Sequence, residues 1–501
     1  MLLFFVRRDN IKVGGYDLDE EQLEAATTNN KHTLVIAGAG SGKTTTIIGR
    51  IKYLIENGTY YKDILCISFT NASVQSLKDK LKEETNLDFD IYTFHKLSLE
   101  ILKENNQDYN ICQSNMLEYI IDEYLNNIIL NNKELMYTVL RYYNIFELKI
   151  SVLKKYKELN IDSLKKLIAK FIRLMKTNGY GISEFTKFYN KKFKTKKYYL
   201  LKIILIIYQL YQNELMYNQE IDFDDMIIKA SNNKQIVHNY KHIIIDEYQD
   251  SSMIRFNLIK SILDKTGASL FVVGDDFQSI YKFAGCNLNV MLDFSKYFND
   301  SKIYKINNTY RNSQELIDIA GSFVMKNPNQ IKKNLKSIKH IDNPIEIIKY
   351  HNYKKEFKEL LNKLRDKKIL ILGRNNNDIY KLIDKDYIYK DDILLYKPLN
   401  MKVKYLTVHK SKGLEEEVVI IINLYDDALG FPSKLEDDKI LSLVSPKTDK
   451  YPYSEERRLF YVALTRTKTK VYLYTPHYQK SIFVDEIKKI VNKSKITKKN
   501  N

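Results

Sequence analysis

Residues 37–44 read AGAGSGKT and have the residue types of a phosphate-binding loop. The apolar run at 33–36 precedes this loop and a helix-forming stretch follows it, so it joins a strand to the start of a helix. Backbone N–H groups and the positive end of a helix converge on an anion in such a turn. Lys43 can supply a cation for the outer phosphates, and Thr44 a hydroxyl for Mg²⁺. The expected nucleoside-triphosphate site consists of Ala37, Gly38, Ala39, Gly40, Ser41, Gly42, Lys43 and Thr44.

Two more polar segments follow apolar runs of strand length. The first begins with Asp246, which can hold Mg²⁺ through water, and Glu247, which can orient or deprotonate an attacking water. The second contains Gln278, which can sense a terminal phosphate, and the aromatic residues Tyr281 and Phe283 lie just beyond it. Each aromatic residue is either a stacking surface or a core residue, and the sequence leaves both alternatives open.

The elements that must position these groups are predicted by apolar periodicity. Runs of strand length alternate with helical spacing in two blocks, which is typical of parallel α/β sheets covered on both faces. Between about 101 and 220 the strand signal vanishes and apolar faces recur at helical spacing, which predicts an all-helical insertion. The expected strands lie at 34–36, 64–69, 243–245 and 270–273 in the first block, and at 345–348, 369–372, 405–408, 418–422 and 471–474 in the second.

The predicted organisation has two α/β cores. The first core takes 1–100 and 221–303, the helical insertion takes 101–220, and the second core takes 304–501. The formal charge of +18 is consistent with a nucleic-acid partner, although abundant Lys, Asn, Ile and Tyr also fit the codon bias of an AT-rich genome. The cysteines, Cys66, Cys112 and Cys286, have no metal-ligand spacing. From this cysteine usage we expect a reduced cytoplasmic compartment. Because no apolar run has the length of a bilayer, we expect no membrane partner.

The order of the motifs along nearly the whole chain resembles the UvrD/Rep type of superfamily 1 DNA helicase. This resemblance implies two RecA-like P-loop cores with ATP and Mg²⁺ bound between them. It implies adenine contacts from Gln22 and from Tyr310 in Asn308-Thr309-Tyr310-Arg311, and ribose contact from Glu415. Arg311 and Arg466 are then the two arginines that reach the γ-phosphate from the second core. The expected catalytic residues are Glu247, Gln278, Arg311 and Arg466.

The same resemblance implies a single-stranded DNA track and 3′ to 5′ movement along it. Segments similar to the family's TFTN, TFH, DFDD and TLHSAKGLE motifs occur in the family's order. Phe283 stands where the family usually has Trp, and a phenyl ring still stacks on bases. The expected DNA-binding residues are Phe69, Asn71, His95, Phe223, Tyr281, Phe283 and His409.

The chain departs from the family pattern in length. The resemblance implies a large helical domain in the second core, but residues 378–405 leave no room for it. The given sequence ends soon after Arg466, so we expect any nuclease to be a separate polypeptide. The main interpretation is an ATP-dependent helicase or translocase acting on single strands and duplex junctions. The alternatives are a DNA-activated ATPase subunit that serves a partner nuclease or repair factor, as in phage defence, and a non-catalytic DNA-binding protein. The pathway, whether DNA repair, replication restart or defence, stays open.

Overall fold

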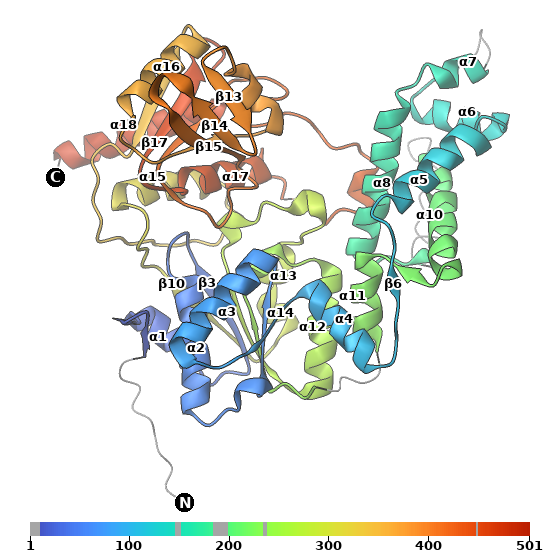
Figure 1. Cartoon of the computed structure of the whole chain (residues 1–501), viewed down its shortest axis with the longest axis horizontal. Helices are drawn as coiled ribbons and strands as arrows, with labels where there is room; N and C mark the ends of the chain where they lie inside the picture. The colour runs from blue at the N-terminus through green and yellow to red at the C-terminus, as the bar shows by residue number, and fades with distance from the viewer. Residues whose placement is uncertain (1–10, 146–151, 184–198, 234–237, 447–448, 501) are drawn as a thin grey trace, which may run out of the picture.

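Two α/β lobes lie one above the other, and a helical lobe stands beside them (Figure 1). The computed structural model describes residues 11–145, 152–183, 199–233, 238–446 and 449–500. Among these residues, no helix has both the length and the apolar character needed to cross a bilayer. The mixed α/β class with two RecA-like parallel-sheet cores, predicted from the sequence, is confirmed.

The lower lobe is built on a parallel sheet in the order β10-β3-β9-β8-β4-β5. Alternate residues of β4 enter different apolar clusters, Leu65 and Ile67 on one face and Ile64 and Cys66 on the other, because successive side chains of a strand point to opposite faces. The strands are β3 (His32–Ala37), β4 (Ile64–Ser68), β5 (Asp90–Thr93), β8 (His242–Ile245), β9 (Ser269–Gly274) and β10 (Ser301–Ile306), with a small hairpin of β1 (Lys12–Val13) and β2 (Tyr16–Asp17).

Helices cover both faces of this sheet (Figure 1). They are α1 (Glu20–Ala26), α2 (Lys43–Glu56), α3 (Asn71–Thr85), α4 (Phe94–Glu104), α11 (Phe223–Asn232), α12 (Met253–Thr266), α13 (Asn289–Leu292) and α14 (Phe294–Tyr297), with short turns η1 (Tyr61–Asp63), η4 (Tyr248–Asp250), η5 (Asp276–Gln278) and η6 (Lys282–Ala284).

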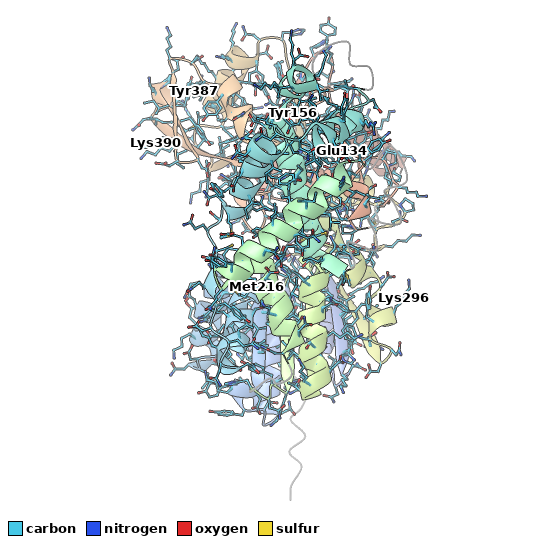
Figure 2. The ribbon with its side chains drawn as sticks, turned by 90° about the vertical axis from the view of Figure 1, so that its right-hand side faces the viewer. Glu134, Tyr156, Met216, Lys296, Tyr387 and Lys390 are labelled. Carbon is cyan, nitrogen blue, oxygen red and sulfur yellow. The ribbon has the colours of Figure 1, made fainter. Side chains whose placement is uncertain are left out.

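The helical insertion rises from one end of the first core, and in Figure 2 it faces the viewer, with Glu134 and Tyr156 near its top and Met216 near the first core. Its root is fixed by Lys176, which is buried between the carboxylates of Asp222 and Asp225. The described elements are β6 (Asn110–Ile111), α5 (Met116–Glu123), η2 (Tyr124–Ile128), α6 (Lys133–Tyr142), α7 (Val152–Lys157), α8 (Ile161–Thr177), α10 (Leu200–Tyr217) and β7 (Glu220–Ile221).

The upper lobe holds a second sheet in the order β11-β17-β16-β12-β15-β14-β13. The strands are parallel up to β15, whereas β14 and β13 add an antiparallel hairpin at one edge. The strands are β11 (Ile345–Tyr350), β12 (Ile369–Gly373), β13 (Tyr387–Lys390), β14 (Ile393–Tyr396), β15 (Met401–Thr407), β16 (Glu416–Ile421) and β17 (Thr467–Pro476); the helices are α15 (Gln314–Val324), α16 (Tyr353–Lys363), α17 (Ser454–Leu464) and α18 (Ile482–Asn500), with η7 (Asn376–Lys381), η8 (Lys397–Leu399) and η9 (Leu441–Leu443).

Two expected boundaries differ from the structure. The boundary at 303/304 falls inside β10, which pairs with β3 as far as Ile306, so the first core extends to that residue. The boundary at 100/101 falls inside α4, where Ile101 and Leu102 pack in the core of the first sheet. Both elements continue across the expected limits because residues beyond those limits, Ile101 and Leu102 in α4 and Ile306 in β10, are buried in the first core.

A segment of the second core crosses to the helical insertion, and we call residues 433–446 the strap. Ile440, Leu441 and Val444 of the strap are buried in the apolar core of the insertion. Asn178 at the end of α8 donates its side-chain N–H to the carbonyl of Val444 at 3.0 Å. The strap also has two polar contacts with the insertion, an ion pair between Asp437 and Lys170 and a hydrogen bond that the Tyr142 hydroxyl donates to Asp438.

Candidate nucleotide-binding and nucleic-acid site

The phosphate loop at 37–44 joins β3 to α2 at the carboxyl edge of the first sheet, the edge where α/β proteins bind ligands. Gly40 and Gly42 both have positive φ, and Gly42 caps the helix N-terminus. A Cβ on Gly40 would lie 2.4 Å from the Cβ of Arg311, and one on Gly42 would lie 2.5 Å from Nε2 of Gln22. Positive φ favours glycine at both positions, and at Gly40 the Cβ of Arg311 also leaves no space for a side chain.

The carboxylates at the end of β8 meet lysines from both cores. Nζ of Lys43 lies 2.9 Å from Oε1 of Glu247, and Nζ of Lys412, from the second core, lies 3.7 Å from Oε2. Burial alone would raise the pKa of Glu247, but the two lysines outweigh it and lower the pKa below its ordinary value. Burial, followed by the charge of Glu247, raises the pKa of Asp246 to about 6. Glu247 is therefore held as a carboxylate between two cations.

Gln278 of the first core meets Arg466 of the second core, and Arg311 lies close enough to Arg466 for their charges to interact. Nη2 of Arg466 donates to Oε1 of Gln278 at 3.4 Å, and its other N–H groups donate to the carbonyls of Val462 and Leu414. Arg466 is only 1% exposed, and within the described part of the chain no ion pair joins it to a carboxylate. Burial, followed by the charge of Arg311, lowers the pKa of Arg466 to about 10. A buried cation beside a second cation is a suitable site for an anion such as a terminal phosphate.

The residues expected at adenine also come together. The hydroxyl of Tyr310 donates to Asp19 at 2.6 Å, and the Tyr310 amide donates to the carbonyl of Gly40 at 2.9 Å. Gln22 forms a capping box with Asp19 at the start of α1 and donates to the carbonyl of Ser41 at 3.1 Å. The Tyr310 ring is 46% exposed and lies beside the phosphate loop, whereas both ends of the Gln22 amide are engaged by backbone groups.

Glu415 and Thr44 have different surroundings. Glu415 pairs with Arg311 and lies 3.1 Å from Lys468, so the residue expected at ribose is engaged by two cations. Thr44 is the second residue of α2, and Asp246 follows the last residue of β8. A hydroxyl and a carboxylate at the carboxyl edge of one sheet are the hard oxygen donors that Mg²⁺ prefers.

One aromatic cluster lies on the first core. The rings of His95 and Phe223 are 5.2 Å apart, and Phe69 packs edge-on against Phe94 at 5.2 Å. The guanidinium of Arg255 lies 5.3 Å from the centre of the Phe69 ring. Phe223 is 52% exposed, and Asn71, the first residue of α3, is exposed as well. The cluster thus combines flat faces with a cation, as single-strand sites do.

A second cluster spans the two cores. Tyr281 donates its hydroxyl to the carbonyl of His409 at 3.1 Å, and the rings of Phe283 and His409 are 5.3 Å apart at 87°. Phe283 is 51% exposed, which disfavours the alternative that it is a core residue, whereas Tyr281 is largely covered. Phe223 and Phe283 open into one groove of about 1030 Å³, whose other wall is α8 of the helical insertion.

Some residues at the site are absent from the sequence-based expectation. Lys412 lies inside the segment Thr407 to Glu415 that the resemblance singled out, yet its contact with Glu247 joins residues far apart in the sequence. Arg255 lies on α12, near no quoted motif, and its place beside Phe69 had no sequence signal. Gln249 is also missing from the expectation: its side-chain N–H donates a hydrogen bond to Glu247, and its side-chain oxygen accepts one from the backbone N–H of Asp275 at 2.9 Å.

Comparison with known proteins gives two family matches. Residues 18–299 match the UvrD/REP helicase N-terminal domain, and residues 389–477 match the UvrD-like helicase C-terminal domain. The chain is 26% identical to DNA helicase IV of Escherichia coli over 487 residues, which covers 93% of this chain and 69% of that protein. It is 30% identical to the ATP-dependent DNA helicase Rep of Buchnera aphidicola (Acyrthosiphon pisum) over 369 residues, covering 69% of this chain and 51% of that protein. The chain is 28% identical to the ATP-dependent DNA helicase PcrA of Bacillus subtilis over 334 residues, which covers 64% of this chain and 41% of that protein.

Proposed function

The chain belongs to the UvrD/REP helicase family, whose members are ATP-dependent DNA helicases, and from this premise we propose that it moves 3′ to 5′ along single-stranded DNA by hydrolysing ATP between its two cores. The observation that carries the proposal is the contact between Gln278 of the first core and Arg466 of the second. Catalytic groups divided in this way act together only when the cores are close, so that hydrolysis and inter-core movement are coupled.

The residues of the phosphate loop fit a nucleotide with Mg²⁺. Thr44 and Asp246 would hold the ion, which supplies charge neutralisation on the phosphates. Lys43 exchanges its ion pair with Glu247 for the phosphates, and Glu247 then faces one cation fewer. The Glu247 carboxylate is then no longer paired with Lys43 and can accept a hydrogen bond from the attacking water.

The second core supplies the remaining charge. Arg311 lies against Gly40 of the phosphate loop and Arg466 contacts Gln278, and arginines that reach a transferred phosphate from a second domain are worth roughly 10³–10⁵ in rate. Base stacking contributes about 1–3 kcal/mol per base. Opening one base pair costs about 1.4 kcal/mol, so one exchange of stacking contacts per step is comparable with the work of separating a pair. Phe69, Phe223 and Phe283 are the proposed stacking residues, with Asn71, His95, Tyr281 and His409 beside them.

Strand displacement on 3′-tailed, 5′-tailed and blunt duplexes, with ATPase measured in parallel, tests the proposal. We expect displacement of the 3′-tailed duplex and none by the Glu247→Gln variant. Displacement of the 5′-tailed duplex alone would overturn the polarity. ATPase that is stimulated by single strands without strand displacement would favour the ATPase-subunit alternative. The small hairpin β13–β14 stands where the family resemblance implies a large domain, so this alternative should then be tested with a partner nuclease. A chain without ATPase would be the non-catalytic binding protein.

A further inference from the structure

The loop that carries Gln278 is enclosed by residues of the second core. Phe277 packs against the ring of Tyr461 at 5.2 Å, and the carbonyl of Ser279 accepts from Nε of Arg458 at 2.7 Å. The segment at 325–341, which leads from α15 to β11, also lies against this loop and contributes Lys333. The loop therefore belongs to the first core by its place in the sequence, but residues of the second core pack against it and form hydrogen bonds with it.

The side chain of Lys333 is 2% exposed and lies between two carboxylates that are fully buried. Its Nζ contacts Oδ1 of Asp275 and lies 2.6 Å from Oδ1 of Asp276, and it stands 3.8 Å above the ring of Phe277. Asp276 accepts two more hydrogen bonds from the same segment, from Nε2 of Gln330 and the backbone N–H of Ile331, both at 2.8 Å. Every one of these contacts joins the two cores.

Asp275 transmits the contact to the catalytic residue. Its Oδ1 takes Lys333 and the backbone N–H of Phe277 at 3.1 Å, while its Oδ2 accepts from Nε2 of Gln278 at 2.6 Å. The amide nitrogen of Gln278 is thus fixed, and its Oε1 is left to face Arg466. A carboxylate that is held at both oxygens cannot rotate, so the orientation of Gln278 depends on the cation that holds Asp275.

We propose that Lys333 is a positioning residue for the ATPase reaction: from the second core, and through Asp275, it keeps the side chain of Gln278 oriented toward Arg466. This inference rests on the proposed ATPase function, but Lys333 itself touches neither the phosphate loop nor Glu247 in the contacts that bury it. In this proposal its effect on Gln278 passes through Asp275, the residue that bonds the Gln278 amide.

Lys333→Met tests the proposal. With single-stranded DNA present, we expect kcat for ATP to fall roughly tenfold to a hundredfold while KM changes less than about twofold, because positioning is lost and binding is not. The kcat of the Gln278→Ala variant should be lower than that of the wild type by a similar factor. The double variant Lys333→Met/Gln278→Ala should be no slower than Gln278→Ala, because both changes remove the same orientation. Multiplying losses in the double variant would overturn the proposal.

A purely structural role is separated by charge-balanced and matched variants. Lys333→Met leaves two buried carboxylates without their cation and lowers stability, whereas Lys333→Met/Asp276→Asn reduces the excess charge and still leaves Asp275 without its cation. We expect the balanced variant to regain melting temperature but not kcat; recovery of both would overturn the proposal. Lys358→Met is the control, since Lys358 also lies between two carboxylates, of Asp384 and Asp386, on α16 of the second core. It should leave kcat unchanged.

A second measurement does not depend on activity. The backbone N–H of Phe277 is protected by Asp275, so hydrogen exchange of the peptide at 275–279 should become faster in Lys333→Met and stay unchanged in Lys358→Met. Unchanged exchange at 275–279 would overturn the inference. A wild-type chain without any ATPase would instead overturn the proposed function, and the exchange result would still decide whether Lys333 positions the loop.

Discussion

Glu247 lies between Lys43 of the phosphate loop and Lys412 of the second core, and its role differs from that of Lys43. Glu247→Gln should abolish turnover and still bind ATP, because it removes the base and leaves the phosphate contacts. Lys43→Ala should lose both turnover and most ATP affinity. Steady-state ATPase and equilibrium binding of a fluorescent ATP analogue check the pair. Full activity in either variant would contradict the assignment of the site.

Phe283 presents about half of its surface to the groove it shares with Phe223. Phe283→Ala should leave melting temperature, ATP binding and much of the DNA-stimulated hydrolysis intact while sharply slowing translocation, because the stacking face is lost and the phosphate site is untouched. Streptavidin displacement from end-labelled single strands measures movement on the same preparation. A normal translocation rate would contradict a stacking role, and a joint loss of stability and ATPase would identify a core residue instead.

His409 offers a test by pH. Burial, followed by the charge of Arg374, lowers its pKa to about 4, so the ring is neutral above about pH 5. The unfolded chain binds more protons between pH 6.5 and 4, so His409 destabilises the fold as pH falls through that window. A neutral ring adds no charge to DNA binding. The ratio of Kd values for His409→Gln and wild type on single strands should therefore be the same at pH 5.5 and 7.5, and a ratio that grows at pH 5.5 would indicate an imidazolium contact.

Individual residues with motif signals could be predicted, and those that act through long-range contacts could not. The phosphate loop, Asp246 and Glu247 follow strand ends in a pattern that chemistry alone explains. Lys333 stands in a lysine-rich stretch where nothing distinguishes it from its neighbours, and only folding brings it to Asp275, 58 positions away. Its burial depends on three segments meeting, which no local pattern encodes.

At the scale of elements, the central strands were predicted because they are continuous apolar runs buried on both faces. β10 was missed because it is an edge strand whose residues Lys302, Ile303 and Lys305 are exposed, so its sequence lacks a buried run. β13 and β14 were missed for a similar reason: they form an antiparallel edge hairpin with alternating burial, which short mixed runs do not distinguish from a loop.

The strap is the element whose removal has the clearest expected effect. Replacing residues 437–446 with a Gly-Ser linker of equal length should expose the surface that Ile440, Leu441 and Val444 cover, at about 1.5–3 kcal/mol for each side chain. Hydrogen exchange should become faster in α8 and stay unchanged in α2, which the strap does not contact. Charge changes alone, such as Asp437→Asn, should have little effect because that pair is exposed. Unchanged exchange in α8 would show that the strap contributes nothing to the insertion.

At the scale of the whole molecule, we expect ATPase that requires Mg²⁺ and is strongly stimulated by single-stranded DNA, because DNA that contacts Phe223 on one core and His409 on the other helps to align the divided catalytic groups. Affinity for single strands should fall steeply with added salt, because phosphate contacts dominate binding that is independent of sequence. Titrations at several salt concentrations with homopolymer strands check both points. ATPase that is indifferent to DNA would contradict the coupling.

The strap also closes a ring of three bodies. The insertion is joined to the first core where Lys176 lies between Asp222 and Asp225, and to the second core through the strap. The second core is joined to the first through the loop around Gln278. Because the three bodies are joined in a ring, we expect a rotation that narrows the space between the two cores to tilt the helical lobe as well. Since α8 of that lobe walls the groove that holds Phe223 and Phe283, we expect the width of this groove to change with the distance between the cores.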